Sequence, residues 1–184
     1  MGQTTGDQTI EVLLFRMESF DPFAVLGLER RFDLDPAAMD RAYLERSAAL
    51  HPDMLAQHAM ADMGGEEDEG IAELNRARHV LGDPEQRAVA LWKLWGGVES
   101  KDMPPGFLMQ MMEVREAIER AAGDKAAAAK WEQWAAQRRG EYQKRVGVLF
   151  AKLTAGSPAN AATLKQIKME LNGWRYVERL IEQL

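Results

Sequence analysis

The chain has 184 residues, of which 46% are hydrophobic and 28% charged, so its length fits one domain or two small ones. It contains no cysteine, which excludes disulfides, a thiolate nucleophile and cysteine-based metal sites and is compatible with a reducing cytoplasm. The net charge of −6, with acids and bases interspersed, argues against a nucleic-acid partner, because phosphate binding needs a concentrated basic surface.

Residues 1–18 look like a polar leader without a committed structure. The stretch 10–15 is apolar but contains Glu11, follows no basic segment and has no small-residue cleavage site, so it does not predict a signal peptide. No apolar run elsewhere approaches the ~20 residues that a membrane-spanning helix needs. We therefore expect a cytoplasmic protein without a membrane partner.

The composition predicts an all-α fold. β-branched residues are sparse, while Ala, Leu, Met, Glu, Arg and Gln dominate. Three Asp-Pro pairs mark helix starts, because aspartate caps a helix and proline fits its first position. The predicted helices of the first half are 23–28, 37–50, 71–81 and 84–95, with 54–70 as a loop whose acidic run 66–69 is solvated. They form one compact unit over 19–97, followed by a linker over 98–106.

The second half predicts a three-helix bundle over 107–184. Its helices are 107–122, 125–154 and 161–184, and their short connections favour antiparallel neighbours. Apolar side chains at helical spacing predict two core stripes: Phe107, Met111, Val114 and Ile118 on the first helix, and Leu164, Ile167, Leu171 and Trp174 on the last. Trp131 and Trp134 are also assigned to the core.

Three apolar residues of the first bundle helix do not belong to its core stripe. Leu108, Met109 and Met112 lie roughly 90–190° away from it, on the face that should contact water. The residues that border them are charged: Glu113, Glu116 and Arg120. An apolar patch rimmed by charge indicates an interaction surface, and methionine suits an adaptable contact. The alternative is that another part of the chain covers this face.

The tripeptide His51-Pro52-Asp53 is the most informative motif. It follows the predicted helix 37–50 and precedes an acidic loop and another helix, an order that resembles the J domain. The resemblance implies docking onto a DnaK-type chaperone ATPase, with Arg41 and Arg46 as the basic residues that the preceding helix offers. The alternative reading is a helix-terminating proline between two solvated polar residues.

Four blocks extend this resemblance to most of the chain. FDPFAVLGL, HPD, LNRARHVLGDPEQRA and FLMQMMEVREAIE are similar to successive blocks of the HscB-type J-domain co-chaperones of iron–sulfur cluster assembly. The likeness covers about 20–184 and implies an N-terminal J domain followed by a three-helix bundle. It implies a co-chaperone that stimulates a DnaK/HscA-type ATPase and delivers an IscU-type iron–sulfur scaffold protein to it. The residues that would bind the scaffold are Leu108, Met109, Met112, Glu113, Glu116 and Met169.

The chain departs from the family pattern at Leu50, Met54, Arg120 and Met169, the last of which stands where the family has Phe, and these departures keep other readings open. Leu50 and Met54 flank the tripeptide where the family often has Tyr and Lys, and Arg120 stands at an acidic position. The alternatives are a J-domain protein for a different client, a helical adaptor with a vestigial tripeptide or, more remotely, a hydrolase using His51. No nucleophile, P-loop or metal-ligand spacing accompanies the three histidines, so we expect no catalysis, metal or cofactor. His58 and His79 are assigned to the surface.

Overall fold

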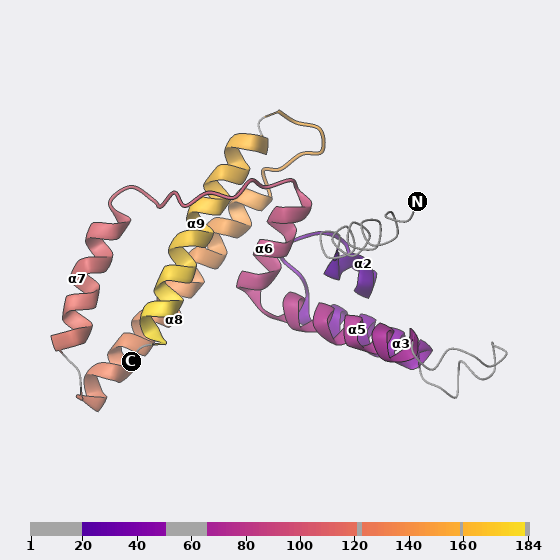
Figure 1. Cartoon of the computed structure of the whole chain (residues 1–184), viewed down its shortest axis with the longest axis horizontal. Coiled ribbons are helices and arrows are strands. Elements are labelled where there is room, and N and C mark those ends of the chain that lie inside the picture. Colours follow the sequence, from indigo (N-terminus) through magenta and orange to yellow (C-terminus); the bar gives the residue numbers. More distant parts are fainter. Residues whose placement is uncertain (1–19, 51–65, 121–122, 159, 183–184) are drawn as a thin grey trace, which may run out of the picture. The chain divides into compact units, whose positions relative to one another are not determined.

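The computed structural model describes residues 20–50, 66–120, 123–158 and 160–182, and in this part of the chain every regular element is an α-helix. Figure 1 shows the helices in chain order: α2 (Pro22–Leu26), α3 (Pro36–Ala49), α5 (Glu66–Gly82), α6 (Pro84–Leu94), α7 (Phe107–Arg120), α8 (Lys125–Phe150) and α9 (Asn160–Ile181). The predicted all-helical class is confirmed for these residues. The leader 1–18, His58 and the tripeptide His51-Pro52-Asp53 with Met54 lie outside the described residues.

Aspartate caps start the helices as the sequence predicts. Asp21 accepts hydrogen bonds from the backbone N–H groups of Phe23 and Ala24, at 3.0 and 3.2 Å. Asp83 caps α6 in the same way, accepting from the N–H of Gln86 at 2.8 Å. Each of these caps satisfies backbone donors that have no partner inside the helix, and the following proline lacks such a donor.

Helix α5 starts earlier than the sequence analysis placed it. The acidic run 66–69, assigned to a solvated loop, forms the first turn of the helix, so that prediction is wrong. Acidic residues interact favourably with the positive end of a helix dipole, and glutamate is a good helix former. Gly70 lies inside α5, where a Cβ atom would be 3.2 Å from Leu50 Cδ1.

The described residues divide into two compact units, of which the first contains 20–29, 36–50 and 66–79. Its buried apolar side chains are Pro22, Phe23, Leu26, Leu74 and Ala77. All fourteen residues of α3 are described, and none of them is buried. Polar contacts therefore contribute to the packing of α3 on α5. Tyr43 donates its hydroxyl to Asn75 Oδ1 at 2.7 Å, and Arg78 pairs with Asp40 at 3.1 Å.

The second unit contains 30–35 and the described residues from Val80 onward, and α8 and α9 run side by side through it (Figure 1). The predicted core stripes are confirmed: Phe107, Met111 and Ile118 are buried with Val114 half-buried, and Leu164, Ile167, Leu171 and Trp174 are all buried. Trp131 and Trp134 are instead half-buried, with their rings edge to face at 5.7 Å. The two rings pack on each other but remain partly exposed, so the assignment of this pair to the core is correct only in part.

Helix α6 packs with the bundle helices in the second unit. Its Glu85 accepts from Arg175 on α9 at 3.0 Å. The segment 30–35 joins the same unit through Phe32, whose ring stacks on that of Phe150 at 5.6 Å. The units thus divide before Val80, whereas the sequence analysis drew the domain boundary after residue 97. The bounds 19–97, 98–106 and 107–184 remain a prediction about functional domains.

The linker between α6 and α7 lies along α9. Asn172 donates its side-chain amide to the backbone carbonyls of Ser100 and Asp102, both at 2.9 Å. Lys168 pairs with Glu99 at 2.6 Å. A segment without regular structure keeps its backbone polar groups satisfied through such contacts. The linker therefore has a defined path up to the start of α7.

Candidate partner-binding surfaces

The start of α7 is anchored by glycine geometry and one aromatic side chain. Gly106 has φ 74°, a left-handed conformation that favours glycine, and Phe107 follows as the first helical residue. The ring of Phe107 meets that of Tyr176 on α9 edge to face at 5.5 Å. This contact joins the start of α7 to α9.

One face of α7 is buried and the other is exposed. Met111 is only 2% exposed, whereas its neighbour Met112 is 63% exposed. Leu108 and Met109 share the open face with 55% and 72% exposure. Their predicted exposure is confirmed, and we call Leu108, Met109 and Met112 the α7 patch. Large apolar side chains gathered on one helix face are more informative than single exposed ones.

Charged side chains surround the α7 patch. Glu113, Glu116 and Arg120 are exposed, as the helical spacing predicts. Arg120 donates from Nε to the backbone carbonyl of Glu116 at 3.1 Å. One turn away, Arg115 pairs with Glu119 at 2.9 Å. The carboxylates of Glu113 and Glu116 thus form an acidic rim on which a basic partner group has room to bind.

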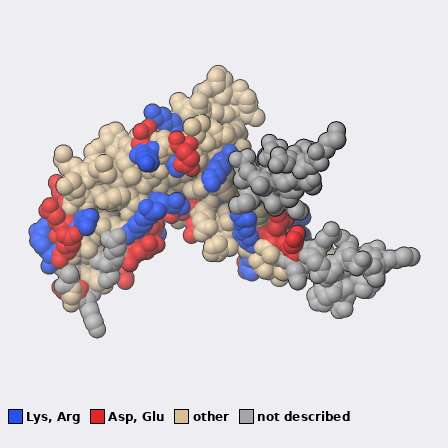
Figure 2. Space-filling model, in the orientation of Figure 1, with Lys and Arg blue, Asp and Glu red and all other residues tan. Residues whose placement is uncertain are grey.

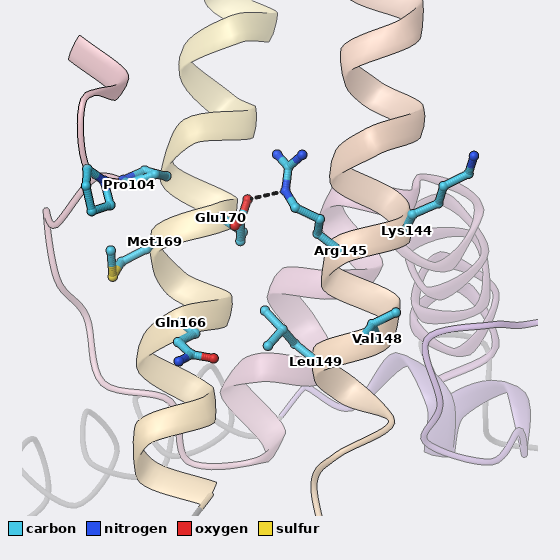
Figure 3. A pocket seen from close by; sticks show the side chains of 9 residues that line it. Pro104, Lys144, Arg145, Val148, Leu149, Gln166, Met169 and Glu170 are labelled. Atoms are coloured by element: carbon cyan, nitrogen blue, oxygen red, sulfur yellow. Dashed lines mark hydrogen bonds and ion pairs between the residues drawn. The ribbon is translucent and has the colours of Figure 1, made fainter. Parts of the chain in front are cut away.

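Met169 belongs to a pocket rather than to the α7 patch. Its side chain is half-buried on α9, so it is less exposed than its position off the core stripe suggests. Figure 3 shows it beside Pro104 of the linker. The described residues that line this pocket come from the linker, α8 and α9, and none comes from α7.

The two arginines assigned to chaperone binding are both exposed on α3. The guanidinium of Arg46 lies against Gly27, the residue that ends α2 with φ 64°. Arg46 thus also packs within the first unit, which the sequence analysis did not anticipate. Arg41 does not lie against Gly27. The surface assignment of His79 is confirmed, because its side chain is exposed.

Several ionisable groups of the second unit have displaced pKa values, but they belong to packing. Burial raises the pKa of the Tyr142 hydroxyl to about 12. Burial also raises the pKa of Glu85, although Arg175 opposes the shift. It lowers the pKa of Arg87, whose Nε is buried without a hydrogen-bond partner. None of these groups lies on α7.

Charges of both signs are mixed over the face of the described surface that Figure 2 shows. Within the described ranges no group of three or more metal-ligating side chains comes together. No helix in that same part of the chain is long and apolar enough to span a bilayer.

Comparison with known proteins identifies the family of this chain. Residues 103–184, from the linker through α9, match the family model described as the HSCB C-terminal oligomerisation domain. A protein of Burkholderia mallei, co-chaperone protein HscB homolog, is 38% identical over 149 residues, 76% of this chain and 81% of that protein. The chain belongs to the HscB co-chaperone family. Its HscB relative from Bordetella pertussis is 33% identical over 172 residues, 91% of this chain and 96% of that protein.

Solved HscB structures share the fold. The human co-chaperone HscB has a TM-score of 0.70 and 24% identity, covering 89% of this chain and 79% of the human one. HscB from Vibrio cholerae has a TM-score of 0.58 and 26% identity, covering 89% and 98%. These structures have an N-terminal J domain and a C-terminal helical bundle, so the predicted fold is confirmed.

Sequence reasoning missed the pocket beside Met169. Its only local signal was Pro104-Pro105, which fixes an extended backbone without amide donors. Helical periodicity shows which face of a helix is apolar, but not where two helices and a linker leave space between them.

Proposed function

We propose that this HscB-family protein stimulates the ATPase of a DnaK/HscA-type chaperone and presents an IscU-type iron–sulfur scaffold protein to it. The observation that carries the proposal is the α7 patch, three apolar side chains each more than half exposed on a helix whose other face is core. Family membership supports the same role. In this proposal the protein works in the cytoplasm, without catalysis, metal or cofactor of its own.

The chaperone contact is assigned to His51-Pro52-Asp53. Proline stiffens the chain there, while the imidazole and carboxylate offer directional polar contacts. Arg41 and Arg46, exposed on α3, add positive charge for an acidic surface of the ATPase. Two arginines are a small basic surface, so we expect a contact that depends on the tripeptide.

The scaffold contact is assigned to the α7 patch, its acidic rim and Met169. Apolar anchors supply most of the binding energy at such a surface, because burying them removes apolar area from water. Glu113 and Glu116 orient the partner by attracting basic groups. Methionine side chains adapt to the shape of the partner, which helps if the scaffold changes conformation.

In this proposal one chain binds both the scaffold protein and the chaperone and so brings them together. A scaffold bound to α7 reaches the chaperone at an effective concentration set by the connection between the two contacts. The chain thereby converts a two-protein encounter into a step within one complex. ATP hydrolysis belongs entirely to the partner.

The chaperone half is tested with His51→Gln. We expect this variant to abolish stimulation of the DnaK/HscA-type ATPase while its circular dichroism and melting temperature stay those of wild type. Glutamine keeps polar character but removes the imidazole. A stimulated rate equal to wild type would contradict the assignment.

The scaffold half is tested by calorimetry with the Leu108→Ala, Met112→Ala double variant. We expect about a tenfold or greater loss of scaffold affinity with ATPase stimulation in the absence of scaffold unchanged. Val98→Ala is the matched control, because Val98 is 80% exposed and lies outside α7.

The same two assays separate the alternative functions. ATPase stimulation by wild type without scaffold binding would favour a J-domain protein for a different client. Absence of both activities would favour the helical adaptor, and turnover without any ATPase partner would favour a hydrolase.

A further inference from the structure

A pocket of about 420 Å³ lies between the linker, α8 and α9, and we call it the linker pocket. Figure 3 shows Leu149 on α8 and Gln166 on α9 at opposite sides of it, with an ion pair bridging the two helices. Its described lining consists of Pro104, Pro105, Lys144, Arg145, Val148, Leu149, Gln166, Met169 and Glu170. The volume is in the range of sites that bind a small ligand or a large side chain.

The walls of the linker pocket are mostly apolar and open to solvent. Val148 lies near the C-terminal end of α8, a helix that packs on α9, and its side chain is 59% exposed. Leu149 and Met169 are half-buried, so part of each side chain stays accessible. An apolar hollow of this kind favours an occupant with an aliphatic or aromatic side chain.

The charges at the pocket favour an acidic occupant. Arg145 donates from Nε to Glu170 at 2.9 Å and lies 3.8 Å from Glu141, so its charge is compensated within the chain. The lining then has one further charge, that of the exposed Lys144. A carboxylate next to the apolar group of the occupant would be attracted by this ammonium group.

The position of the pocket points to a polypeptide rather than a free small molecule. Pro105 lines the pocket, and only Gly106 and Phe107 separate it from Leu108 of the α7 patch. Three residues span at most about 11 Å, so the pocket and the patch have adjoining edges. A stable interface buries about 800 Å² on each partner, more than the three side chains of the patch offer. A protein that covers the patch therefore extends over neighbouring surface.

We propose that the linker pocket receives an apolar side chain, adjacent to a carboxylate, from the same polypeptide that covers the α7 patch. This inference rests on the proposed function for the identity of that polypeptide, the iron–sulfur scaffold protein. Val148 and Leu149 hold the apolar side chain, and Lys144 pairs with the carboxylate. The pocket thereby adds a second anchor that fixes the orientation of the partner on the patch.

The test is calorimetric titration of the full-length chain with the IscU-type scaffold protein of the same organism. Val148→Asp places a charge in the pocket, and Gln166→Trp fills it from the opposite helix. Both residues are exposed, so the fold should survive, which circular dichroism checks. We expect each variant to weaken binding about tenfold. Val98→Asp, outside the pocket, is the matched control and should stay within about twofold of wild type.

Lys144→Glu tests the charge separately. We expect about a threefold loss of affinity and a weaker dependence on salt, because an exposed pair contributes little and is screened. Lys152→Glu, which changes the net charge equally but does not line the pocket, should have no such effect.

The outcomes separate the pocket from the proposed function. If both pocket variants bind like wild type while Leu108→Ala with Met112→Ala loses affinity, the pocket inference fails and the scaffold proposal stands. If wild type itself binds no scaffold, the proposed function fails and the inference about its partner fails with it. If the pocket variants and the patch variant lose affinity while the controls Val98→Asp and Lys152→Glu bind like wild type, the two proposals are supported together.

Discussion

Trp92 on α6 donates its indole N–H to the backbone carbonyl of Leu164 on α9 at 3.0 Å. The indole is 1% exposed, and Lys168 of α9 lies over its ring with Nζ 4.9 Å from the centroid. Gly97 packs so closely against the indole that a Cβ atom there would collide with the ring. One side chain thus joins α6, the start of the linker and α9 in a single buried contact.

Replacing Trp92 by Phe should destabilise the protein by about 1–3 kcal/mol, because the buried hydrogen bond from the indole to the Leu164 carbonyl would be lost. Loss of part of the ring volume adds to this cost. Urea unfolding followed by fluorescence and circular dichroism measures the change in midpoint. Trp95→Phe is the matched control, since Trp95 is only half-buried. Equal midpoints for the two variants would contradict the role of the hydrogen bond.

Two glycines should respond to alanine in opposite directions. Gly27 has φ 64° and Arg46 lies against it, so Gly27→Ala should cost about 1–2 kcal/mol. Gly140 lies inside α8 with no atom within 4 Å of an added Cβ, so Gly140→Ala should stabilise by about 0.5–1 kcal/mol. Thermal unfolding of both variants beside wild type measures the two shifts. A stabilising Gly27→Ala would show that the left-handed turn is not required.

Met111 and Met112 are adjacent in sequence but differ in environment, which allows stability and binding to be separated. Met111→Ala should destabilise the protein by about 2–5 kcal/mol, because Met111 is 2% exposed and leaves a cavity. Met112→Ala should change stability by no more than about 0.5 kcal/mol. Denaturant titrations measure the free energy of unfolding of both variants, and calorimetry then measures the scaffold affinity of Met112→Ala. A large stability loss in Met112→Ala would mean that the α7 patch is covered.

Tyr142 should make stability depend on pH in the alkaline range. Burial raises the pKa of its hydroxyl to about 12 from 10.0, because the ring stacks on that of Trp174 and the hydroxyl lies against Gly173. A raised pKa in the folded state contributes stability below pH 10 that is lost as the pH rises through about 12. Tyr142→Phe should lose less stability over this interval. Unfolding free energies of both proteins from pH 9 to 12 provide the comparison, which cancels the titration of other groups.

The buried and exposed faces of α7 could be predicted from the spacing of its residues alone. The spacing of Phe107, Met111 and Ile118 predicts its buried face, and the structure buries all three. The exposure of Leu108 and Met112 follows by geometry, because a helix has a fixed angle per residue. By contrast, Met169 lies on a helix whose far side meets the linker, and its helical angle alone says nothing about that contact.

The sequence by itself determined that the described elements are helices and which faces of α7 and α9 are buried, but it did not place the start of α5. Asp21, Asp83 and the glycines act through bonds to residues a few positions away, so their effects on helix ends do not depend on the fold. The tertiary structure alone decided that Trp92 reaches Leu164, that Phe32 stacks on Phe150, and that a pocket opens beside Met169. These contacts join residues far apart in the chain, and their existence depends on how helices pack rather than on the order of residues within any one of them.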